Sequence, residues 1–174
     1  NMEKRGGGLL SLDLVDRTDE LEDYFQIQIE VETCDAMGAN FINSILEHIG
    51  QFFGRLVEKS DLPHKETYEV VMAILSNYTP NCLVRSEVSC SIESLNDISP
   101  GVRGEDFARR FKRAIDISRV DRFRATTHNK GIFNGVDAVI LATGNDFRAV
   151  EACGHTYASR DGQYRGLSFC SIKN

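Results

Sequence analysis

The chain has 174 residues, of which 41% are hydrophobic, and this size suits one or two compact domains with a buried core. Its formal net charge of -6 argues against nucleic acid as the main partner, because phosphate backbones bind basic surfaces. No apolar run approaches the roughly 20 residues that a membrane span needs. Five widely spaced cysteines without a CxxC pair indicate a reducing, cytoplasmic protein, and we expect no disulfide framework and no bound metal.

The first part of the chain predicts a small sheet with one helix. Residues 10–15 and 24–32 alternate between apolar and polar side chains, as strands with one buried face do, and the acidic stretch 16–23 between them predicts a hairpin loop. A broad apolar stripe then predicts a long helix that is capped by Asp35 and ends near Ser60. A further strand is predicted over residues 67–75. This order indicates an α+β fold.

The second part of the chain is less regular in its pattern. Residues 82–91 predict another strand, and residues 103–118 predict a helix. The stretch 122–134 is polar and basic, and the apolar run 136–142 fits either a buried helix or a buried strand. Helical spacing resumes at Phe147.

The segment Asp35–Asn40 is the first candidate site, because it follows a strand and opens a long helix. Free N–H groups at a helix N-terminus bind phosphate, and Gly38 would let a ligand approach the backbone closely. The alternative is ordinary helix capping, with small residues that serve close packing.

The segment Arg124–Gly135 is the second candidate site. It places Lys130 among amide side chains, and a lysine there could donate to a developing oxyanion. Asn134, four residues further on, would face the same side if the segment is helical. The alternative is a polar loop with a solvated lysine.

The segment Thr143–Asp146 is the third candidate site, because it follows a buried apolar run. An acid in such a place is costly unless it is paired, and Lys130 is a plausible partner for Asp146. Asp146 or Asn145 could equally cap the helix that follows, and this cap does not exclude a catalytic role.

Together these segments resemble the class II, bacterial-type 3-hydroxy-3-methylglutaryl-coenzyme A (HMG-CoA) reductases. Residues 35–40 are similar to the DAMGAN or DAMGMN element, which contacts the nicotinamide dinucleotide in that family. Residues 127–135 are similar to the catalytic-lysine motif THNKGIMNG, and residues 142–152 to ATGNDWRAVEA, which carries the catalytic aspartate. The resemblance spans nearly the whole chain.

The resemblance implies an enzyme that interconverts HMG-CoA with mevalonate and coenzyme A by two hydride transfers with NAD(H) or NADP(H). Lys130 would polarise the thioester and then the aldehyde carbonyl, and Asp146 would organise that lysine and its proton network. The other positions that carry over are those that hold the hydroxymethylglutaryl group, Arg124, Asn134 and Asn77, and those that line the cofactor, Asp35, Met37, Gly38 and Asn40.

The resemblance also implies a domain order. Residues 1–76 would form part of a ferredoxin-like, antiparallel small domain that binds the cofactor, and residues 77–174 part of a mainly helical large domain. The family builds its sites across a homodimer. Its members are more than twice as long, and the catalytic glutamate and histidine have no match here, so we expect a central fragment that is inactive alone.

Two other functions remain open from the residues themselves. One is a module that binds a nucleotide or coenzyme A without chemistry, and the other is an interaction domain that uses the basic cluster Arg109–Arg124. A paired acid and lysine would favour the enzyme, because a binding module does not need such a pair.

Overall fold

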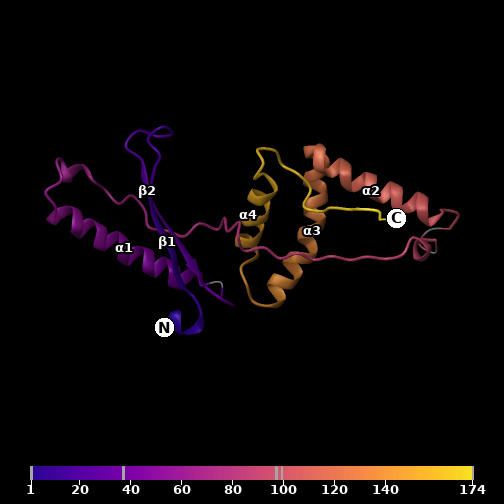
Figure 1. Cartoon of the computed structure of the whole chain (residues 1–174), viewed down its shortest axis with the longest axis horizontal. Coiled ribbons are helices and arrows are strands. Elements are labelled where there is room, and N and C mark those ends of the chain that lie inside the picture. Colours follow the sequence, from indigo (N-terminus) through magenta and orange to yellow (C-terminus); the bar gives the residue numbers. More distant parts are fainter. Residues whose placement is uncertain (1, 37, 97, 99, 174) are drawn as a thin grey trace. The chain divides into compact units, whose positions relative to one another are not determined.

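The computed structural model describes residues 2–36, 38–96, 98 and 100–173. The chain divides into two compact units, residues 1–75 and 76–174 (Figure 1). The first unit contains an antiparallel pair of strands and one long helix, and the second contains three long helices. The α+β class predicted from the sequence is therefore confirmed.

The two predicted N-terminal strands form a hairpin. Strand β1 (Gly8–Asp16) pairs antiparallel with β2 (Phe25–Glu32), after a short 3-10 turn η1 (Glu3–Arg5). The turn between the strands is closed locally, because the Asp16 carboxylate accepts hydrogen bonds from the backbone N–H and the hydroxyl of Thr18, at 2.9 and 2.7 Å. The hairpin loop expected from the acidic stretch lies at this place.

Helix α1 (Ala39–Lys59) carries the predicted apolar stripe but begins later than expected. Its N-cap position is Gly38, in a left-handed conformation with φ of 68°, so the prediction that Asp35 caps the helix is wrong. Glycine suits this position because its backbone is left-handed and because a Cβ would lie 3.2 Å from Thr33 Cγ2. The helix ends where Ser60 turns to extended backbone.

The predicted strand over residues 67–75 is not formed within the described residues. A 3-10 turn, η2 (Lys65–Thr67), is followed by irregular backbone. This backbone lies against α1, where the Leu75 N–H donates to Asn43 Oδ1 at 3.0 Å. Its apolar composition favours a strand, but a strand also needs a partner ladder, and Val71 and Met72 are 77% and 73% exposed. The sheet of the described chain has two strands, fewer than a ferredoxin-like sheet contains.

The second unit is built on helices α2 (Gly104–Val120), α3 (Arg122–Ala142) and α4 (Phe147–Ala158). Helix α3 packs against both α2 and α4 (Figure 1). The helix predicted over 103–118 is confirmed as α2. The strand predicted over 82–91 is wrong, since this stretch is irregular and Val84 and Val88 are almost fully exposed. A short turn, η3 (Glu93–Leu95), precedes α2.

The polar stretch 122–134 is helical, and so is the apolar run that follows it, because both belong to α3. A single residue, Asp121, separates α3 from α2 and accepts hydrogen bonds from the backbone N–H groups of Phe123 and Arg124. This side-chain cap starts α3 at once after α2 ends. The alternative of a polar loop with a solvated lysine is therefore excluded, and the segment is helical.

The core of the second unit gathers around α3. Small or polar side chains occupy much of it, and its most deeply buried residues include Ala125, Asn129, Ser118 and Ala158. The aromatic ring of Phe133 covers the side of α4, where a Cβ at Gly154 would overlap it. Among the described residues, no helix combines the length and the apolar character needed to cross a membrane.

Candidate functional site

Helix α3 has an inner face that is buried in the core and an outer face that is exposed. The inner face carries Ala125, Asn129 and Phe133 at steps of four, with exposed fractions of 0%, 0% and 5%. Successive residues of an α-helix point about 100° apart, so the residues that follow these positions turn away from the core. The inner face holds the helix in place and leaves the outer face accessible.

Lys130 and Asn134 lie on the outer face, and both are exposed. Because α3 is continuous here, their four-residue spacing puts them on the same side of the helix, as the sequence predicted for a helical segment. In the described part of the chain, Lys130 forms no ion pair. Its ammonium is therefore available to a ligand.

Asn129 fixes the inner face through two hydrogen bonds to the C-terminal segment. Its amide donates to the Arg165 carbonyl at 2.9 Å, and its oxygen accepts from the Leu167 N–H at 2.9 Å. Between these two residues, Gly166 packs on Ser118 so closely that a Cβ would overlap the serine hydroxyl. Asn129 lies directly before Lys130 in the motif, but no feature of the sequence pattern distinguishes it as a buried residue.

Asp146 is the N-cap of α4, as one of the sequence alternatives predicted. Its carboxylate accepts from the Arg148 N–H at 3.0 Å and from two nitrogens of the Arg148 guanidinium, both at 3.1 Å. The guanidinium holds the pKa of Asp146 below its ordinary value. The side chain is 40% exposed, so the expectation of a buried acid is wrong.

The expected ion pair between Lys130 and Asp146 is not formed within the chain. Lys130 lies twelve residues before Ala142, the last residue of α3, which corresponds to about 18 Å along the helix axis. Helix α4 returns along α3, since the rings of His155 and Phe133 lie 4.7 Å apart, so Asp146 stays at the far end of this hairpin. A lysine side chain spans only about 6 Å and cannot bridge the gap.

The other two residues expected to hold the substrate also lie in this unit. Arg124 is exposed in the first turn of α3, about 120° around the helix from Lys130. Burial lowers the pKa of His128, and the charge of Arg124 adds to this effect. Asn77 is exposed in an irregular stretch, which Thr79 ties to α4 through a hydrogen bond from its N–H to Cys153 Sγ at 3.4 Å.

The residues expected to bind a cofactor belong to the first unit. Asp35 and Asn40 are exposed on either side of the left-handed Gly38, and Met37 lies outside the described residues. Within the described part of the chain, no side chain caps the first turn of α1. The free N–H groups of this turn suit an anionic group such as a phosphate.

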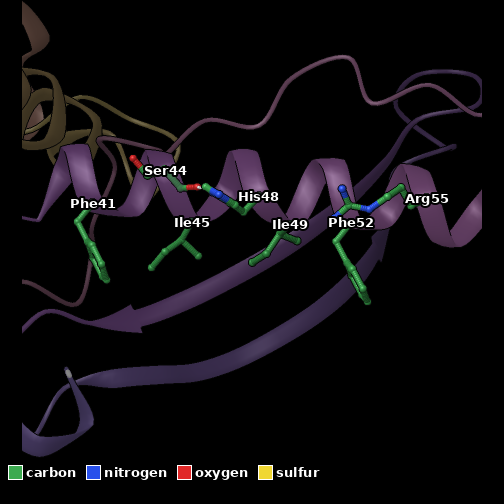
Figure 2. Close-up of a pocket in the computed structure, with 7 residues that line it drawn as sticks. All are labelled: Phe41, Ser44, Ile45, His48, Ile49, Phe52 and Arg55. Carbon is green, nitrogen blue, oxygen red and sulfur yellow. Dashed lines mark hydrogen bonds between the residues drawn. The ribbon is translucent and has the colours of Figure 1, made fainter.

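A groove runs along α1 from this end of the helix. Figure 2 shows that apolar side chains on one side of α1 line it, namely Phe41, Ile45, Ile49 and Phe52. Its few polar groups come from Ser44, His48 and Arg55. This lining suits apolar packing better than the binding of an anion. Among the described residues, no group of three histidine, cysteine or acidic side chains could hold a metal ion.

Comparison with known proteins gives consistent matches. A family model described as hydroxymethylglutaryl-coenzyme A reductase matches residues 1–173. A probable 3-hydroxy-3-methylglutaryl-coenzyme A reductase of Borreliella burgdorferi is 35% identical over 97% of this chain and 36% of its own length. The reductase of Archaeoglobus fulgidus is 34% identical over 82% of this chain and 29% of its own length.

Solved structures agree with these matches. A 3-hydroxy-3-methylglutaryl-coenzyme A reductase of Streptococcus pneumoniae has a TM-score of 0.75 and 36% identity, over 98% of this chain and 43% of that one. A class II enzyme from the same organism, bound to NADPH in open conformations, has a TM-score of 0.75 and 36% identity, over 99% and 39% of the two chains. The chain therefore spans less than half the length of these relatives.

The ion pair at the start of α4 predicts a pH-dependent stability. Asp146→Asn keeps a good N-cap but loses the charge that pairs with Arg148, so the variant is expected to be less stable than the wild type at neutral pH. The pKa of Asp146 is lowered in the folded state, so its stabilising effect is complete above the ordinary carboxyl value of 3.8 and disappears as the pH falls below it. Urea unfolding of both proteins from neutral to acidic pH measures this.

At each pH, the unfolding free energy of the variant is subtracted from that of the wild type. Other groups that titrate in both proteins, such as His128, cancel in this difference. A difference that persists unchanged at acidic pH would contradict the assigned ion pair.

Proposed function

Because the chain belongs to the hydroxymethylglutaryl-coenzyme A reductase family, we propose that it is part of an enzyme that interconverts HMG-CoA with mevalonate and coenzyme A. The reaction takes two hydride transfers with NADH or NADPH. One observation carries this proposal: Lys130 is exposed, forms no ion pair with the residues that the structure describes, and lies beside Asn134 on the outer face of α3, whose inner face is held by buried contacts.

Lys130 is the proposed catalytic residue. Each hydride addition to the thioester and then to the aldehyde leaves negative charge on the carbonyl oxygen, and an ammonium donor stabilises this charge. The same donor serves both steps, because the charge develops on the same oxygen. Asn134 lies one helical turn further along and can donate its amide to the hydroxymethylglutaryl group. Arg124 and Asn77 complete the proposed substrate site.

Residues 1–76, which contain the whole first unit, are the proposed cofactor domain. The uncapped N–H groups at the start of α1 fit a phosphate of the dinucleotide, and the left-handed Gly38 leaves its backbone open to close approach. Asp35, Met37 and Asn40 are the proposed neighbours of this group. When bound, the nicotinamide supplies the hydride. Residues 77–174 form the proposed substrate part, and the free cysteines of the described chain fit a cytoplasmic location.

A homodimer is part of this proposal. Asp146 is the proposed acid of the site, yet the helix geometry keeps it about 18 Å from the level of Lys130 within one chain. The lysine of one copy would therefore meet the aspartate of another, and Arg148 would hold that carboxylate ionised until the two meet. A site shared in this way needs two copies to be complete.

Replacing Lys130 tests the catalytic role. In the complete enzyme that contains this sequence, Lys130→Ala is expected to lower kcat for NAD(P)H oxidation with HMG-CoA by at least about 100-fold, because the oxyanion loses its donor. Lys112→Ala is the matched control, since Lys112 is a surface lysine that pairs with Asp116 on α2 and lies outside the proposed site. For both variants, we would measure the steady-state rate of NAD(P)H oxidation, the binding of coenzyme A, and the fold by circular dichroism.

If Lys130→Ala keeps nearly full activity, the catalytic proposal fails. A complete enzyme without any reductase activity that still binds coenzyme A would identify a binding module instead.

Mixing two inactive variants tests the shared site. Lys130→Ala and Asp146→Asn are unfolded together and refolded as a mixture, so that half of the dimers contain one copy of each. If lysine and aspartate come from different copies, one site of each mixed dimer is intact, and about a quarter of the wild-type activity returns. Refolding each variant alone is the control. No recovery in the mixture, with dimers present by light scattering, would place both residues in the same copy.

A further inference from the structure

We propose that Asn129 is a positioning residue, which sets the direction of the Lys130 ammonium by locking the rotation of α3 about its own axis. This inference rests on the proposed function of Lys130. Asn129 is fully buried in the middle of the motif, and both of its hydrogen bonds reach across to Arg165 and Leu167.

A carboxamide satisfies both partners at once. Asn129 gives a donor to one backbone carbonyl and an acceptor to one backbone N–H, on either side of Gly166. An aspartate of the same size would lose the donor and place a negative charge against a carbonyl oxygen. A leucine would leave both backbone groups unpaired in a buried place.

The segment that Asn129 holds is itself fixed by other contacts. The Gly166 N–H donates to the Ser118 carbonyl at 2.8 Å, and the Arg165 N–H donates to the Ala158 carbonyl at 3.0 Å. The Arg165 guanidinium also donates to the Arg119 carbonyl at 2.7 Å. The segment is therefore anchored to the ends of α2 and α4, and Asn129 ties α3 to an independent support.

The other inner-face contacts of α3 have little directional preference. Ala125 offers only a methyl group, and the Phe133 ring packs on Gly154 and His155 without a hydrogen bond of its own. The two amide hydrogen bonds are directional, so they resist rotation of the helix more strongly than these apolar contacts. Among the inner-face residues of α3, Asn129 is the one whose contacts fix the rotation of the helix about its own axis.

A small rotation has a large effect on the neighbouring lysine. Lys130 follows Asn129 and points about 100° away, so it moves with the helix surface. A rotation of about 15° at a radius of roughly 6 Å displaces a side chain by about 1.5 Å. A misplacement of about 1 Å can cost up to about 100-fold in rate. In the described chain, Lys130 has no ion pair that would hold its ammonium in place if the helix backbone turned.

The test uses the complete enzyme with HMG-CoA and NAD(P)H. Asn129→Asp is expected to lower kcat by about 10- to 100-fold and to change KM less than about threefold, because the lysine acts on the transition state. Ile115→Val, on the buried face of α2, is the matched control: it loosens the same core, and its kcat is expected to stay at the wild-type value.

A double-variant cycle separates positioning from a general structural effect. If Asn129 acts through Lys130, adding Asn129→Asp to Lys130→Ala lowers the residual rate less than about twofold. If the loss in this background equals the loss in the wild type, the proposal is overturned. Wild-type activity of Lys130→Ala alone would overturn both this inference and the proposed function. An inactive Lys130→Ala enzyme with equal losses in the two backgrounds would overturn this inference only, so the two failures are distinguishable.

Asn129→Gln covers the case in which the aspartate variant does not fold. Glutamine keeps the donor and the acceptor but is one methylene longer, so the hydrogen bonds survive while the helix shifts. A folded Asn129→Gln enzyme with reduced kcat supports positioning. A folded enzyme with wild-type kcat overturns it, because the direction of Lys130 would then not depend on the length of this side chain.

Discussion

The buried amide of Asn129 is the contact on which the arrangement of the second unit depends. A carboxamide without partners in a protein interior costs several times the net value of one hydrogen bond, so its two partners must stay in place. These partners lie 36 and 38 residues further along the chain, on either side of Gly166. One side chain therefore joins α3 to the C-terminal segment, and glycine is required where that segment meets Ser118.

This constraint explains how a single motif can serve both packing and the proposed chemistry. Along residues 127–135, the side chains of Asn129 and Phe133 turn inward, and those of Lys130 and Asn134 turn outward. Each outward residue directly follows an inward one. A helix that is held from one side in this way presents the proposed catalytic and substrate-binding groups on a surface whose direction is fixed by the core.

Sequence patterns predicted the elements whose signal is local. The alternation along β2 and the apolar stripe of α1 are periodic within one element, and both elements are found, although Phe25 and Phe52 are 53% and 56% exposed. The strands expected over 67–75 and 82–91 are absent from the described chain, because β-rich composition does not supply a partner strand. Helix α3 was missed over residues 122–134, since its buried face carries an alanine and an amide where a pattern search expects large apolar residues.

The contacts of the candidate residues followed less directly from the sequence than the choice of these residues. The motifs identified Lys130, Asn134 and Asp146, and the cap role of Asp146 followed from its place before a helix. Its ion pair with Arg148 was missed, although an arginine two residues after an N-cap aspartate is within reach. The prediction of an ion pair between Lys130 and Asp146 was wrong because most of the residues between them belong to one helix, whose length separates the two side chains.

The most direct test of the division between the two faces of α3 is the unfolding free energy of the 174-residue chain in urea. Lys130→Ala and Asn134→Ala remove outward side chains and are expected to change it by less than about 0.5 kcal/mol. Asn129→Ala leaves a buried carbonyl and N–H unpaired and is expected to lower it by about 1–3 kcal/mol. A loss for Lys130→Ala as large as that for Asn129→Ala would show that the lysine holds the fold, and the separation of packing from chemistry would be wrong.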